Sequence, residues 1–156
     1  MNDETDLHLK GVLDREIAAA LALTTTLEAE RVALIGDAPQ AVIDQAAEKT
    51  RLFGLLERLE TERIEICDAA QLTLPPLQRG QPFVTAGVSE MVGGSWRALL
   101  ELIAGCRIAN NVNGYIINAR CAQIGQLLQV IRGGSPTTYG PRGKPPGGTL
   151  RELARA

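Results

Sequence analysis

The sequence predicts an all-α protein, and two observations carry this prediction. Aromatic residues make up only 3% of the chain, whereas strands usually show more valine, threonine and aromatic alternation. All eight prolines lie outside the long stretches in which apolar residues recur every three or four positions. Proline removes a backbone donor and clashes with the preceding helical turn, so these prolines mark helix boundaries. We therefore expect an elongated antiparallel three-helix bundle over residues 1–132, with helices at about 6–34, 38–72 and 95–132.

The first predicted helix, residues 6–34, has one apolar face. Residues spaced by three and four positions share such a face. The members of this face are Leu9, Leu13, Ile17, Ala20, Thr24, Leu27, Arg31 and Leu34. Gly36 then ends the helix, Asp37 is placed to cap the next one, and Pro39 suits a first helical turn. So short a connection makes the first two helices antiparallel neighbours.

The second predicted helix, residues 38–72, has a broader apolar stripe. Its members are Val42, Ala46, Phe53, Leu56, Leu59, Ile66 and Ala70, with Leu52 and Leu55 alongside. Six charged residues are assigned to the other faces as a solvated surface, namely Glu57, Arg58, Glu60, Glu62, Arg63 and Glu65. The connection that follows, residues 73–94, is long and rich in glycine and proline, and residues 83–91 within it are predicted to form a short helix lying on the bundle.

The third predicted helix, residues 95–132, begins after Ser95 as its cap and has the most regular pattern. Spacings of three and four alternate over five heptads, which is typical of a left-handed supercoil. We call this set the third-helix seam: Trp96, Leu99, Ile103, Cys106, Asn110, Asn113, Ile117, Arg120, Ile124, Leu127 and Ile131.

Polar side chains interrupt the third-helix seam at Asn110, Asn113 and Arg120. Burying an unpaired amide costs about 1–3 kcal/mol, so these residues either find partners or lie on an open face. Two interpretations remain: a polar layer that sets the register of the bundle, or a face kept open for a partner helix. Beyond them lies an apolar set that we call the terminal strip: Ile117, Ile124, Leu127, Leu128 and Ile131. If exposed, the terminal strip would receive an amphipathic segment.

Charge and cysteine content narrow the class of protein. The net charge is −2, which argues against a nucleic-acid-binding protein, but residues 132–156 carry +4 and the rest of the chain −6. Three cysteines without metal-ligand spacing indicate small buried side chains in a reducing compartment; they are Cys67, Cys106 and Cys121. The acidic start of the chain is unlike a signal peptide, and no apolar run is long enough to insert in a membrane. We expect a cytoplasmic protein.

Residues that could carry catalysis are scarce. His8 is the single histidine and lies near the acidic N-terminus, where a nucleophile–base pair is hard to hold. Phosphate-binding glycine motifs and metal-ligand spacings are absent from the sequence. We therefore expect no catalytic residues, no metal site and no cofactor.

The C-terminal segment, residues 133–156, is predicted to be a flexible tail. Ten of the sixteen residues from Gly133 to Gly148 are glycine or proline. Tyr139 is the one aromatic residue in this segment, and two interpretations remain: an anchor for docking on another protein, or an incidental tyrosine of the tail.

The order of motifs near the C-terminus resembles the FlgN family. An Asn-x-x-Asn-Gly core spans residues 110–114, and Arg120 follows it. A leucine-rich helix end at 127–133 then precedes a Tyr-Gly-x-x-Gly tail at 139–143. Together these pieces cover about a quarter of the chain, and the preceding helical hairpin also matches the family.

The resemblance implies a flagellar type III export chaperone. Such a protein holds the hook-associated (hook–filament junction) proteins and delivers them to the cytoplasmic domain of the export gate. The residues expected to bind cargo are Asn113, Ile117, Arg120, Ile124, Leu127, Leu128 and Ile131. By the same resemblance, Tyr139 and Gly140 are expected to dock on the gate.

Other functions stay open from the sequence alone. A structural or regulatory coiled-coil protein would use the same seam to associate with itself, and an enzyme is the most distant alternative. A helical type III chaperone for a different flagellar cargo would share this architecture. The sequence does not decide whether the free protein is a monomer or a dimer, or which junction protein it prefers.

Overall fold

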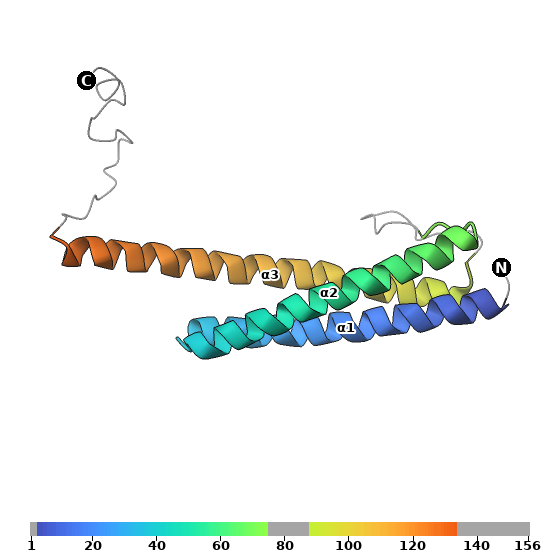
Figure 1. Cartoon of the computed structure of the whole chain (residues 1–156), viewed down its shortest axis with the longest axis horizontal. Coiled ribbons are helices and arrows are strands. Elements are labelled where there is room, and N and C mark those ends of the chain that lie inside the picture. The colour runs from blue at the N-terminus through green and yellow to red at the C-terminus, as the bar shows by residue number, and fades with distance from the viewer. Residues whose placement is uncertain (1–2, 75–87, 134–156) are drawn as a thin grey trace, which may run out of the picture. The chain divides into compact units, whose positions relative to one another are not determined.

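The computed structural model describes residues 3–74 and 88–133. Within these ranges it has three helices and no strand: α1 (Asp3–Ile35), α2 (Pro39–Ala69) and α3 (Glu90–Ile131) (Figure 1). The predicted all-α class is confirmed, and the helices pack as a bundle. The chain divides into two compact units, residues 1–118 and 119–156, which are described separately below. The predicted tail, with Tyr139 and Gly140, and most of the predicted helix at 83–91 lie outside the described residues.

α1 and α2 form an antiparallel hairpin whose turn is closed by the backbone (Figure 1). The Ala38 N–H donates to the carbonyl of Ala33 at 3.1 Å, and Asp37 takes a left-handed φ of 56°. This is the Schellman arrangement, in which a residue past the helix end satisfies a last-turn carbonyl. The prediction that Asp37 caps α2 is wrong, since Ala38 holds the cap position without a side-chain hydrogen bond. Pro39 opens α2 as predicted.

α3 begins earlier than the sequence indicates, and Ser95 is not its cap. The N–H of Val92 donates to Ser89 Oγ at 3.4 Å, so Ser89 satisfies a donor of the first turn. Gly93 and Gly94 lie inside the helix. Each glycine costs about 1 kcal/mol of helix propensity, but Val92 and Trp96 on this turn are both buried in the core. Packing therefore carries the helix through a pair of residues that locally disfavour it.

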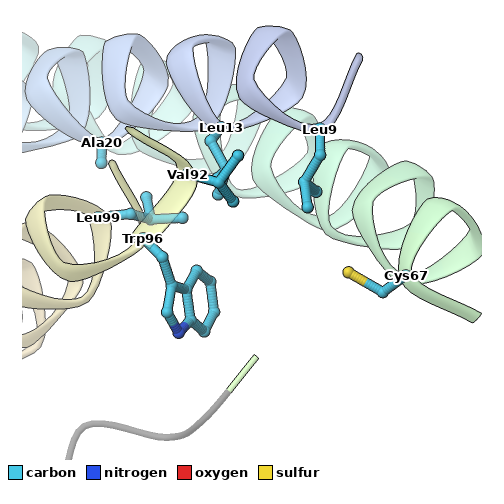
Figure 2. Close-up of a cluster of buried hydrophobic side chains, with 7 residues drawn as sticks. All are labelled: Leu9, Leu13, Ala20, Cys67, Val92, Trp96 and Leu99. Atoms are coloured by element: carbon cyan, nitrogen blue, oxygen red, sulfur yellow. The ribbon is translucent and has the colours of Figure 1, made fainter. Parts of the chain in front are cut away.

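All three helices contribute to the core of residues 1–118. One cluster, drawn in Figure 2, consists of Leu9, Leu13, Ala20, Cys67, Val92, Trp96 and Leu99. The other joins Leu23 and Leu27 of α1 to Leu52 of α2 and Cys106 of α3. Leu9, Cys67 and Val92 share one cluster, so the start of α1, the end of α2 and the start of α3 lie together.

The predicted apolar faces of α1 and α2 need three corrections. Thr24 and Arg31 of α1 are exposed, and Arg31 pairs with Glu28 on the surface. In α2, Leu52, which was predicted to lie beside the stripe, is buried, whereas the stripe member Phe53 is exposed. The face of α1 that is buried repeats every seven residues, and charged side chains occupy part of it.

The cysteines divide into two kinds. Cys67 and Cys106 are buried, as predicted, and burial raises the pKa of the Cys67 thiol above its ordinary value. A thiol held in its neutral form is a poor nucleophile, in keeping with a packing role. Cys121 is exposed, so the prediction of three buried cysteines is wrong for this residue.

Among the described helices, none is long and apolar enough to cross a membrane.

Candidate functional site

Buried charges recur on α1 at every second heptad. Leu9, Glu16, Leu23 and Glu30 follow one another at intervals of seven residues, and all four are buried. Apolar and acidic layers therefore alternate along the inner face of α1. Because a buried carboxylate is costly unless a cation and hydrogen bonds compensate it, each glutamate needs partners from the other helices.

The first polar layer joins all three helices through Arg63. Nε of Arg63 donates to both carboxylate oxygens of Glu16, at 3.0 and 3.2 Å. The guanidinium carbon also lies 4.6 Å from the centroid of the Trp96 ring on α3, a cation–π contact. Burial raises the pKa of Glu16 above its ordinary value, while the charge and hydrogen bonds of Arg63 lower it by less. The assignment of Arg63 to the solvated surface is wrong, because this residue faces the core.

The second polar layer also joins all three helices. Lys49 of α2 lies 2.7 Å from Glu30 Oε1 and donates to Asn110 Oδ1 at 3.3 Å. Nδ2 of Asn113 donates to Glu30 Oε2 and to the carbonyl of Leu27, both at 2.8 Å. Asn113 is only 1% exposed. Asn110 and Asn113 therefore both form hydrogen bonds inside the bundle, which supports the interpretation that they set its register.

The spacing of charged residues in the sequence indicates these two layers, although the apolar pattern does not. Glu16 and Glu30 are separated by the same number of residues as Lys49 and Arg63. In an antiparallel hairpin, equal intervals on the two helices bring both pairs into register at once. Matching the charges of α1 with those of α2 in this way would have identified the two layers, whereas counting apolar residues could not.

The end of α3, unlike the polar layers, is exposed to solvent. Every residue from Cys121 to Gly133 is exposed. The terminal-strip members Ile124, Leu127, Leu128 and Ile131 are therefore uncovered in the unit to which they belong, and Val130 adds a further exposed apolar side chain. Exposed apolar side chains gathered on one helix end mark a surface suited to binding another protein.

The remaining predicted site residues are placed as follows. Ile117 and Arg120 are half-buried, and Asn113 is buried, so the side chain of Asn113 is not part of the exposed surface. His8 is exposed and its Nε2 lies 4.0 Å from Glu62. In the part of the chain that the structure describes, no group of three or more metal-ligating side chains comes together.

Residues 3–74 and 88–118 form a helical bundle with internal polar layers, and the end of α3 has exposed apolar side chains of the kind found at protein-binding surfaces, which is typical of the class of helical binding proteins. A family model described as FlgN protein matches residues 1–147, and the chain belongs to the FlgN family. It is therefore a flagellar export chaperone that binds flagellar export substrates. No curated protein and no solved structure matched the chain.

Proposed function

We propose that this chaperone binds the hook–filament junction proteins in the cytoplasm, prevents their premature self-association and delivers them to the export gate. The observation that carries the proposal is the exposed part of the terminal strip, Ile124, Leu127, Leu128 and Ile131. A subunit that assembles through amphipathic helices cannot bury their apolar faces before assembly. Pairing such a helix with the terminal strip removes both apolar surfaces from water.

The test is a calorimetric titration of the full chain with the C-terminal helical segment of a hook–filament junction protein from the same genome. The critical variant is Ile124→Gln, and the matched control is Ile108→Gln. These two isoleucines lie on the same helix and are similarly exposed, at 56% and 62%. We expect the Ile124 variant to weaken binding by about tenfold or more, whereas the control retains the original affinity.

The position of the bound segment is read out by the exposed Cys121, which lies on the same turns of α3 as Ile124. Saturating junction segment should slow alkylation of Cys121 by N-ethylmaleimide, while Ile124→Gln restores the free rate. A folded chain that shows no binding at tens of micromolar would contradict the proposal. Concentration-dependent dimerisation that itself protects Cys121 would instead favour the self-associating coiled-coil protein.

Docking on the export gate is proposed for Tyr139 and Gly140, with support only from the resemblance of the tail motif to the family. Tyr139→Ala should abolish binding to the cytoplasmic domain of the export gate and leave the titration with the junction segment unchanged. Loss of both interactions together would contradict separate cargo and gate sites.

A further inference from the structure

The charges around the end of α3 are all of one sign. Residues 102–151 contain no aspartate or glutamate. Between residues 116 and 133 the charged side chains are Arg120, near the start of the terminal strip, and Arg132, just past the end of the helix. A partner that covers the terminal strip therefore meets positive charge at both ends of it.

The shape of this helix surface is also specific. Cys121, Ile124, Gly125 and Leu128 stand in the i, i+3, i+4, i+7 relation that forms a hole for one knob of a facing helix. Two of the four have small side chains, and a Cβ added at Gly125 would meet no atom within 4 Å. Glycine inside a helix costs about 1 kcal/mol relative to alanine, and no atom of the described residues lies close enough to require it at this position. A hole with two small walls accepts a large knob and lets the facing backbone approach closely.

We propose that the end of α3 selects one kind of partner segment: an amphipathic helix with bulky leucine- or phenylalanine-sized knobs and acidic flanking residues. This inference rests on the proposed function, since it names the chemistry of the cargo that the terminal strip receives. The acidic flanks pair with Arg120 and Arg132, and the knob fills the hole at Gly125. Electrostatic selection is local, because the chain as a whole carries −2 and would repel an acidic helix elsewhere.

The test uses two synthetic helices, each about three heptads long, with the same leucine seam. One has glutamate at the flanking positions and the other has lysine, and each is titrated into the full chain. We expect the glutamate helix to bind about tenfold tighter than the lysine helix, with the difference shrinking as salt is raised. Equal affinities, or a preference for the lysine helix, would overturn the inference.

Charge-reversed variants test whether the arginines at the end of α3 cause the preference for the glutamate helix. Arg132→Glu should weaken binding of the glutamate helix by about three- to tenfold and strengthen binding of the lysine helix. The control is Arg107→Glu, an exposed arginine on the same helix before the terminal strip, which should alter neither affinity by more than about twofold. If both reversals act alike, the selection is a property of the whole chain's charge and the inference fails.

Glycine substitutions test the hole separately. Gly125→Leu fills it and should weaken binding of the glutamate helix by about tenfold or more. Gly105→Leu is the matched control, because Gly105 is also an exposed glycine inside α3 with open space at its Cβ position. Both variants should gain helix stability, so reduced binding by Gly125→Leu alone cannot come from unfolding.

The junction-protein segment distinguishes failure of this inference from failure of the proposed function. If that segment binds, but neither peptide flank nor Gly125→Leu changes affinity, the chaperone function stands and the selection rule is wrong. If the junction segment fails to bind a folded chain, the proposed function itself is wrong, and the selection rule falls with it.

Discussion

The two parts of α3 have the same apolar spacing but different surroundings. Up to Asn113, the third-helix seam packs against α1 and α2, and its members Trp96, Leu99 and Cys106 are buried. After Asn118, the seam continues with the same intervals, and Ile124, Leu127 and Ile131 are exposed. A heptad pattern therefore identifies the apolar face of a helix, but not whether that face is covered within the same chain.

In α3 the seam asparagines lie inside the bundle and the apolar end is exposed, which reverses the usual placement of polar and apolar residues. Its two seam asparagines lie within the bundle, where one of them is fully buried, whereas the apolar-rich end is exposed. The asparagines have partners on α1 and α2, which fix their position, although Asn113 Oδ1 is buried without a hydrogen-bond partner among the described residues. Hydrogen-bonded polar side chains thus lie within the bundle, and exposed apolar side chains lie at the end of α3.

The largest effect is expected when a carboxylate replaces the buried amide. Asn113→Asp removes two hydrogen-bond donations, to Glu30 and to the carbonyl of Leu27, and places like charges together. We expect a loss of about 3–5 kcal/mol in the free energy of unfolding, measured by urea denaturation at neutral pH.

The matched control for that variant is Asn111→Asp, two positions away on the exposed face of α3. Surface substitutions of this kind stay within about 0.5 kcal/mol. Similar losses for both variants would mean that the charge of the α3 helix, rather than the buried layer, decides stability.

The next contrast compares leucines in the two parts of α3. Leu99 is 3% exposed and Leu127 is 57% exposed. Leu99→Ala should lower the free energy of unfolding by about 2–4 kcal/mol, because it removes buried methyl groups and leaves a cavity. Leu127→Ala should lower it by less than about 0.5 kcal/mol, while weakening the junction-segment titration. A large stability loss for Leu127→Ala would show that the terminal strip is covered in the free protein.

The helices and the apolar face of α3 follow from local sequence patterns, whereas the burial of charged residues and the start of α3 do not. The three helices and the third-helix seam are legible because proline positions and heptad spacing are local properties of the chain. The burial of Glu16 cannot be inferred from such a local pattern, since it depends on Arg63, which is 47 positions away and is found only by matching the charges of α1 with those of α2. Likewise, the start of α3 at Glu90 depends on packing of Val92, which overrides the local preference of Gly93 and Gly94. The burial of charged residues and the positions of helix ends thus depend on tertiary contacts.

The pH dependence of stability tests the first polar layer. The native state binds the Glu16 proton more tightly than the unfolded chain, since burial raises its pKa above the ordinary 4.5. The contribution of Glu16 to stability is therefore fully present below pH 4.5 and is lost as the pH rises through the raised pKa. The difference in unfolding free energy between the original chain and Glu16→Gln should fall over this window, by at most about 1.4 kcal/mol per pH unit.

The control for this pH dependence is Glu57→Gln, which removes an exposed carboxylate on α2. Subtracting the pH profile of this control from that of Glu16→Gln isolates the effect of the buried carboxylate. A difference for Glu16→Gln that is flat or rises with pH would mean that Arg63, rather than burial, dominates the titration of Glu16.

The smallest expected effect is a gain at the end of α2. Gln71 has a φ of 53°, and this left-handed conformation lets its N–H reach Asp68 and the N–H of Leu72 reach Cys67. Glycine adopts that conformation without the Cβ clash of an L-residue, although it loses more entropy on folding. Gln71→Gly should therefore raise the free energy of unfolding by about 0.5–1 kcal/mol.

The matched control is Gln45→Gly in the interior of α2, which should lower the free energy of unfolding by about 1 kcal/mol. Opposite signs for the same substitution inside α2 and just past its end would establish the left-handed turn. Neither variant should change binding at the terminal strip, because neither residue lies at the end of α3.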